Sequence, residues 1–196
     1  TSSVVIEPGQ WRLVNYGENL LALVHNKKVF EWAPSLSNLT TRATVVSGAP
    51  TASRDMIVST PDRHLVFIGT ETTIGTAGSQ DDMFIRWSSQ EDINTYTPTA
   101  TNTAGSQRLT DGSKLLGSIS GKNAIYIWSD TSMSTMKFIG QPFTFGFQQV
   151  GTNCGAASQH GAIEVDGIAY WMGPTGFFKF DGGRVHSLPC LVEDYV

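Results

Sequence analysis

The chain has 196 residues, of which 40% are hydrophobic and only 15% are charged, and its formal net charge is −4. This hydrophobic content supports a packed core and argues against a disordered chain. The 13 lysines and arginines are scattered, which excludes the dense basic patch of a protein that grips nucleic acid tightly. No apolar run approaches the ~20 residues that a membrane-spanning helix needs, so we expect no membrane-spanning segment.

Short apolar alternations, bounded by Gly, Asn, Asp and Ser, run along the whole chain, and helical periodicity is almost absent. In chain order, strands are expected at 20–25, 29–32, 65–69, 83–87, 114–118, 124–128, 136–139, 162–165, 168–172, 177–180 and 184–188. Asp166-Gly167 lies between two of these segments, and an Asp-Gly pair in that position is a strong hairpin signal. Residues 97–106 read as a low-complexity connector, and residues 141–155 as a bend.

Four of the expected strands end in tryptophan, at Trp32, Trp87, Trp128 and Trp171, with intervals of 55, 41 and 43 residues. An interval near this length is what one four-stranded propeller blade uses. We therefore predict an all-β fold with β-propeller-like, four-stranded antiparallel blades, three to four of them in this chain. The blade-like units are expected at approximately 12–60, 61–105, 106–155 and 156–196 of a single region.

The tryptophans have two interpretations. As structural repeat positions they fill the space between neighbouring blades, which buries a large ring. As binding residues they would be exposed and would stack on sugars. The first interpretation is the one that we favour, and Arg86 and Glu31, which precede two of the rings, should then face the other side of their strands.

The sequence offers no recognisable catalytic, metal or cofactor motif. His25, His64, His160 and His186 do not form a metal-binding spacing. Two carboxylate pairs, Asp81-Asp82 and Glu91-Asp92, are loop residues that we expect to be solvated rather than catalytic or Ca²⁺-binding. We therefore predict no catalytic residues, no cofactor and no metal ligand.

The two cysteines, Cys154 and Cys190, are 36 residues apart and lack the spacing of a redox or zinc motif. Two free or buried thiols are the favoured interpretation, and a disulfide stays open. The chain begins without Met and ends on apolar and aromatic residues. We expect it to be part of a longer chain.

Three passages in order resemble the β-propeller of tail nozzle proteins (tail tubular protein B) of short-tailed bacteriophages and the related packaged-DNA stabilisation proteins. The passages are residues 63–67 with 83–89 and 94–98, residues 125–130, and residues 166–172 with 176–182; residues 188–195 fit the segment that follows. The resemblance covers about residues 60–196, and members of the family are far longer than this chain.

The resemblance implies a structural virion protein of a phage tail, made in the bacterial host cytoplasm, without enzyme activity. Copies would assemble as a ring, a hexamer in the family, and would contact other tail proteins such as the adaptor. Packaged DNA would be retained and then ejected through the lumen of this tail tube, without sequence-specific binding. The net charge of −4 agrees with DNA that slides past the wall of the lumen, because such a wall does not attract the phosphates.

Two other functions stay open. The first is a carbohydrate- or receptor-binding β-propeller, because the chain holds five Trp and five Tyr as possible stacking platforms. The second and less expected is a sialidase-type glycosidase. Residues 129–132 only faintly resemble an Asp-box turn, and nothing in the sequence pairs the candidate arginines Arg42, Arg54, Arg63 and Arg86.

Overall fold

The computed structural model describes residues 9–34 and 39–190. Within these ranges the regular structure consists of β-strands and one short 3-10 helix, η1 (Ala77–Ser79). None of the described helices is long and apolar enough to cross a membrane. The fold is therefore all-β, as the alternating sequence pattern predicted.

The strands form four antiparallel sheets of four strands each, and every sheet follows the order of the chain. The first sheet contains β1 (Trp11–Tyr16), β2 (Asn19–Val24), β3 (Val29–Trp32) and β4 (Thr44–Val45). The second contains β5 (Ser53–Ser59), β6 (His64–Thr70), β7 (Phe84–Trp87) and β8 (Gly105–Arg108). The third contains β9 (Leu115–Ser120), β10 (Ile125–Ser129), β11 (Ser132–Gly140) and β12 (Thr144–Thr152). The fourth contains β13 (Ala162–Val165), β14 (Ile168–Gly173), β15 (Gly176–Phe180) and β16 (Val185–Leu188).

Tight turns explain why successive strands pair. The hairpin of β13 and β14 closes at Asp166 and Gly167, which both adopt positive φ angles, 53° and 84°. Two central residues with positive φ give a turn whose twist matches that of the flanking strands. The Asp-Gly hairpin predicted from the sequence is thus confirmed.

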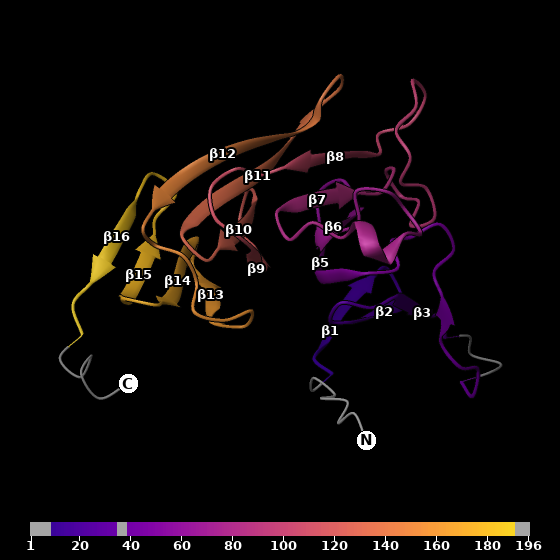
Figure 1. Ribbon diagram of the computed structural model, residues 1–196, viewed down its shortest axis with the longest axis horizontal. Coiled ribbons are helices and arrows are strands. Elements are labelled where there is room, and N and C mark those ends of the chain that lie inside the picture. Colours follow the sequence, from indigo (N-terminus) through magenta and orange to yellow (C-terminus); the bar gives the residue numbers. More distant parts are fainter. Residues whose placement is uncertain (1–8, 35–38, 191–196) are drawn as a thin grey trace.

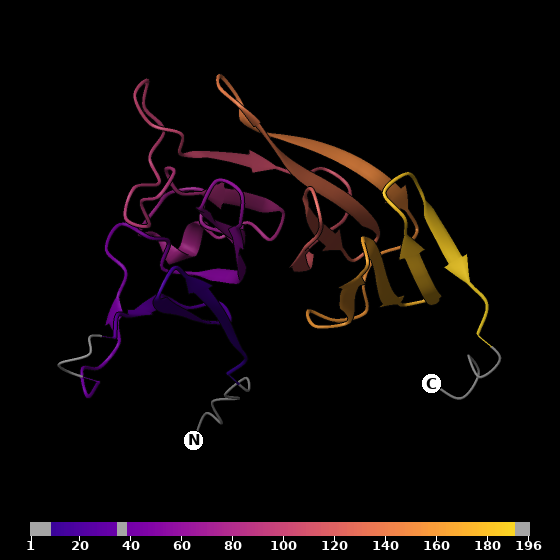
Figure 2. The same ribbon diagram turned by 180° about the vertical axis from the view of Figure 1, so that it is seen from behind.

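The sheets lie side by side as the members of an arch (Figure 1). The first strand of each sheet contacts the first strand of the next one, so that β1, β5, β9 and β13 follow one another along the inner side. The fourth strands β8, β12 and β16 lie on the outer side, and the first and fourth sheets form the two ends of the arch, as the reverse view also shows (Figure 2).

The hydrophobic core is divided among the three junctions between neighbouring sheets. Buried side chains of the first junction include Leu21, Leu23, Val29, Met56, Leu65 and Phe67. Those of the second include Ile57, Val66, Ile85, Trp87, Leu115, Ile125, Ile127 and Phe145. Those of the third include Tyr126, Trp128, Met133, Ala169, Trp171, Phe178 and Phe180. Alternate residues of one strand therefore serve two different junctions.

Several strands were not expected from the sequence. β1 and β5 lie in segments that gave no strand prediction, and β12 occupies most of residues 141–155, which were expected to bend. β5 lies inside the expected unit 12–60, but it pairs with β6 of the second sheet. Residues 191–195, part of the segment that fitted the phage proteins, lie outside the described residues.

Candidate functional site

Asp55 of β5 is the centre of a buried polar cluster to which the first three sheets and the loop before β13 contribute. Its carboxylate has no exposed surface, and Nε of Arg12 on β1 lies 3.2 Å from its Oδ1. Ser118 of β9 donates its backbone N–H, at 3.0 Å, and its hydroxyl, at 2.8 Å, to Oδ2. Gln159, which precedes β13, donates its side-chain amide to Oδ1 at 3.2 Å. We call these four residues the Asp55 hub.

The Asp55 hub is built to hold a charge away from water. Burial raises the pKa of Asp55, and the positive charge of Arg12 and the hydrogen bonds from Ser118 and Gln159 oppose that rise. Arg12 also donates to the carbonyl oxygens of Met56, at 3.2 Å, and Ser118, at 3.0 Å. Buried charges need such partners because an unpaired one is costly. The hub therefore fixes the relative positions of the sheets, and its burial leaves no room for a substrate.

Gly117 adds a steric reason for the close approach of the third and fourth sheets. A Cβ atom built on Gly117 would lie 2.5 Å from the backbone oxygen of Gln159. No side chain fits at that distance, so a glycine is needed where the Gln159 segment crosses β9.

A second buried network contains a carboxylate, an imidazole and a hydroxyl in series. Asp62 accepts a hydrogen bond from Ser59 at 2.6 Å and lies 2.5 Å from Nδ1 of His64. Nε2 of His64 lies 2.9 Å from the Thr103 hydroxyl, which also accepts the backbone N–H of Gln90. This order of groups is that of a hydrolase triad.

The surroundings of His64 favour a structural role for this network. His64 is fully buried, and the rings of Phe138 and Phe145 lie against its imidazole, with centroid separations of 5.8 and 5.1 Å. The carbonyl of Thr103 also accepts hydrogen bonds from Trp87 Nε1 and the Thr144 hydroxyl. Thr103 thus ties the loop before β8 to the second and third sheets, and its hydroxyl is held in place rather than presented to a ligand.

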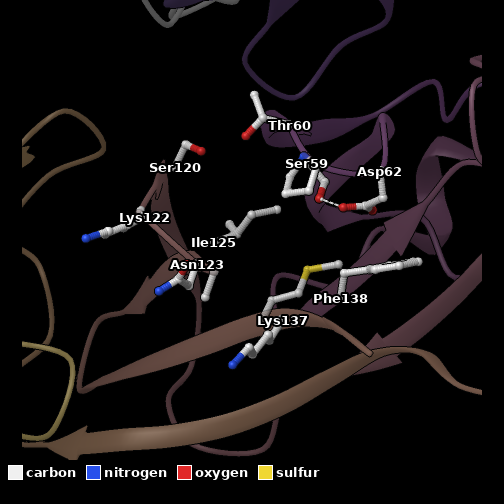
Figure 3. A pocket seen from close by; sticks show the side chains of 13 residues that line it. Ser59, Thr60, Asp62, Ser120, Lys122, Asn123, Ile125, Lys137 and Phe138 are labelled. Carbon is white, nitrogen blue, oxygen red and sulfur yellow. Dashed lines mark hydrogen bonds between the residues drawn. The ribbon is translucent and has the colours of Figure 1, made fainter. Parts of the chain in front are cut away.

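A pocket of about 450 Å³ opens between the second and third sheets. Its walls are the β5–β6 turn, the β9–β10 turn and the part of β11 near Lys137 (Figure 3). The ammonium groups of Lys122 and Lys137 lie on the third-sheet side, and Asp62, which the network above engages, lies on the opposite side (Figure 3). Apart from the engaged carboxylate of Asp62, the polar side chains along the walls carry hydroxyls, an amide and ammonium groups, which suit weak polar contacts more than acid–base chemistry.

The four tryptophans of the sequence repeat occupy different environments. Trp87, Trp128 and Trp171 are almost fully buried, and the rings of Trp128 and Trp171 face each other across the third junction with centroids 5.3 Å apart. Trp32 is only partly buried, and its Nε1 donates to the Thr41 carbonyl at 2.9 Å. Trp32 and Trp87 end third strands, whereas Trp128 and Trp171 lie on second strands. The repeat interval is thus not a repeat of equivalent strand positions.

The carboxylates of the two sequence pairs are each engaged separately. Asp81 pairs with Arg108 at 2.7 Å, and Asp82 receives two hydrogen bonds of 2.7 Å from Arg54. Glu91 lies 3.9 Å from Arg63, and Asp92 accepts the backbone N–H of Asn94. Neighbouring carboxylates thus form ion pairs and turns, and neither sequence pair forms a two-carboxylate catalytic site.

The arginines weighed for a sialidase-type site do not converge. Arg86 is buried and donates to the carbonyls of Glu71, Thr72 and Tyr96, and burial lowers its pKa. Arg54 is held by Asp82, and Arg63 lies over the ring of Tyr16 at 5.2 Å. Arg42 is exposed.

The histidines and cysteines likewise stay apart. Over residues 9–34 and 39–190, no group of three or more His, Cys, Asp and Glu side chains has the arrangement of a metal site. Nδ1 of His25 lies 3.1 Å from the carbonyl oxygen of Arg54, and His186 pairs with Asp181 at 2.9 Å. Cys154 and Cys190 are both free, and burial raises the pKa of the Cys154 thiol.

No protein-family model matches the chain, and the comparison with curated proteins finds no match. The site must therefore be interpreted from its own geometry.

The residues of the Asp55 hub were missed by sequence reasoning. One signal was present: Asp55 precedes Met56, Ile57 and Val58, and a carboxylate next to such an apolar run needs a partner if the run is buried. The partners could not be inferred in the same way, because Arg12 and Gln159 are far away in the sequence.

Proposed function

We propose that this chain is a structural part of a bacteriophage virion, the β-propeller region of a tail nozzle, without enzyme activity. The observation that carries the proposal is the radial arrangement of the sheets. Four successive four-stranded meanders bring their first strands to one side, and the Asp55 hub joins three of these strands, β1, β5 and β9, to the loop before β13. Successive radial sheets of this kind are the units of β-propellers.

The distribution of polar groups suits a mechanical function. Two buried charged side chains, Asp55 and Arg86, are engaged in contacts that hold the sheets and loops in position. The net charge of −4 disfavours tight contact with phosphates, which agrees with DNA that is retained and then released through a lumen. In this proposal copies form a ring, six by resemblance, beside other tail proteins such as the adaptor.

A nonsense mutation in the corresponding gene of a phage tests this proposal. The expected result is heads that package DNA but lose it and carry incomplete tails, and a plasmid-borne copy restores infectivity. Intact infectious particles without the protein would contradict the virion role.

A receptor- or carbohydrate-binding propeller is the second candidate, favoured by the exposed aromatic ring of Trp11. This ring is 55% exposed and lines a pocket of about 560 Å³ with Phe30, Asn26 and Lys27. Aromatic faces of this kind stack on sugars. A glycan array with the wild-type protein and with Trp11→Ala tests this function: binding that the substitution removes would support it, and a blank array would count against it.

A further inference from the structure

Within residues 9–34 and 39–190, the first sheet leaves one apolar face uncovered at its end of the arch. Leu21, Leu23 and Val29 point into the first junction, so the alternate residues point away from the second sheet. We call this uncovered surface the leading face. It consists of Trp11, Leu13, Asn15, Leu20, Ala22, Val24, Phe30, Trp32 and Val45. Leu13 is 57% exposed, and a pocket of about 560 Å³ hollows the face beside Trp11 and Phe30.

In the part of the chain that the structure describes, the fourth sheet leaves a second apolar face uncovered at the other end. Ala169, Trp171 and Phe178 point into the third junction, and the alternate residues form what we call the trailing face. It consists of Ile163, Val165, Ile168, Tyr170, Met172, Phe177, Lys179, His186 and Leu188. Ile163 is 61% exposed, and a pocket of about 470 Å³ hollows this face.

The three internal junctions show what such faces bind. Each sheet has one face toward the N-terminal end of the arch and one toward the C-terminal end. In each junction, the C-terminal face of one sheet packs on the N-terminal face of the next sheet. On β6, for example, Leu65 and Phe67 serve the first junction, and Val66 and Ile68 serve the second. The trailing face of the fourth sheet is therefore the kind of surface on which the leading face of the first sheet would pack.

We propose that two copies of this chain join head to tail, with the trailing face of each on the leading face of the other. Both ends of the arch lie on its open side, so two arches that face each other bring both pairs of faces together (Figures 1 and 2). The pair closes a ring of eight sheets, within the range of four to eight blades that propellers use. Each copy then has two different faces engaged, and the two-fold symmetry leaves no apolar face free.

The size of the contact supports this occupant. The two faces of one copy together approach the roughly 20–30 residues per side of a stable interface. Among the residues of the two faces, Lys179 carries a charge and His186 carries one when protonated, so little desolvation of charge opposes the contact. This pairing follows from the sheets alone and does not depend on the virion role; a six-copy ring would have to join such pairs through other surfaces.

Sedimentation equilibrium of the full chain tests the proposal. We expect the wild type to have twice the mass of one 21.2 kDa chain. Leu13→Glu on the leading face and Ile163→Glu on the trailing face should each reduce the mass to that of one chain. An equimolar mixture of the two variants should form pairs again, because the intact trailing face of one variant meets the intact leading face of the other.

Phe143→Glu is the matched control, since Phe143 is 72% exposed and lies on neither face, and it should keep the wild-type mass. Trp11→Lys and Val165→Lys repeat the test if a first variant loses the wild-type circular dichroism spectrum. A wild type that is monomeric, or whose mass rises beyond two copies with concentration, overturns the closed pair. A mass that responds to only one face, or a mixture that stays monomeric, overturns the head-to-tail contact.

Discussion

The middle of the arch and its two ends use the same kind of strand in different ways. In the second and third sheets, the second strands β6 and β10 are buried on both faces along their whole length. In the first and fourth sheets, β1 and β13 alternate between partly buried and exposed residues, although the exposed residues include Trp11, Leu13, Ile163 and Val165. An apolar alternation thus specifies a sheet face, and the position of the sheet in the arch determines whether that face is covered.

The largest loss of stability is expected in the third junction, where Trp128 is 1% exposed. We expect Trp128→Ala to lower the free energy of unfolding by about 3–5 kcal/mol, because it removes a large buried ring and leaves a cavity. Chemical denaturation monitored by circular dichroism measures the change. Phe143→Ala, at the exposed tip of the β11–β12 hairpin, serves as the control and should leave the midpoint nearly unchanged. A small effect of Trp128→Ala would mean that the third junction is not packed as described.

The Asp55 hub gives the next largest effect. Asp55→Ala should lower the free energy of unfolding by about 3 kcal/mol, the lower end of the range for a broken buried ion pair. The lower end applies because the side chain of Arg12 keeps 20% of its surface exposed. Asp81→Ala is the matched control, since the side chains of its ion pair with Arg108 are 26% and 54% exposed and the pair should be worth less than about 1 kcal/mol. Equal effects of the two substitutions in the same denaturation experiment would contradict the hub.

A smaller effect is expected where the third sheet meets the Gln159 segment. Gly117→Ala places a methyl group against the backbone oxygen of Gln159 and should cost about 1–3 kcal/mol through local displacement. Gly78→Ala is the control, because nothing lies within 4 Å of a Cβ atom at that position. Thermal unfolding that shows no difference between these two variants would place the Gln159 segment farther from β9.

The pH dependence of Asp55 gives the finest test. Its pKa is raised in the folded state by burial, from an ordinary value of 3.8, so the folded protein binds the proton more tightly than the unfolded chain. The contribution of Asp55 to stability must therefore fall as the pH rises from about 4 through the raised pKa. The difference in unfolding free energy between wild type and Asp55→Asn should decline over that interval and then level off. A difference that grows with pH would show that Arg12 outweighs the burial.

The sequence predicted the class of the fold well and the candidate site poorly. Strands that return through tight turns, such as β13 and β14, follow from alternation and an Asp-Gly pair, both of which are local. β5 and β12 were missed because their segments become strands by pairing with β6 and β11, which no local pattern in them encodes. The Asp55 hub joins residues of three sheets and a loop that are distant in sequence, and no local pattern encodes such a contact. The tryptophan interval suggested the blades, yet Trp32 and Trp128 hold different strand positions.

Immunogold electron microscopy of phage particles, with antibody raised against this chain, tests the proposed virion role most directly. Gold label is expected at the tail, on intact particles or after mild disruption that exposes the nozzle. Absence of label from both intact and disrupted particles, with the antibody recognising the denatured protein in infected cells, would contradict a structural place in the tail.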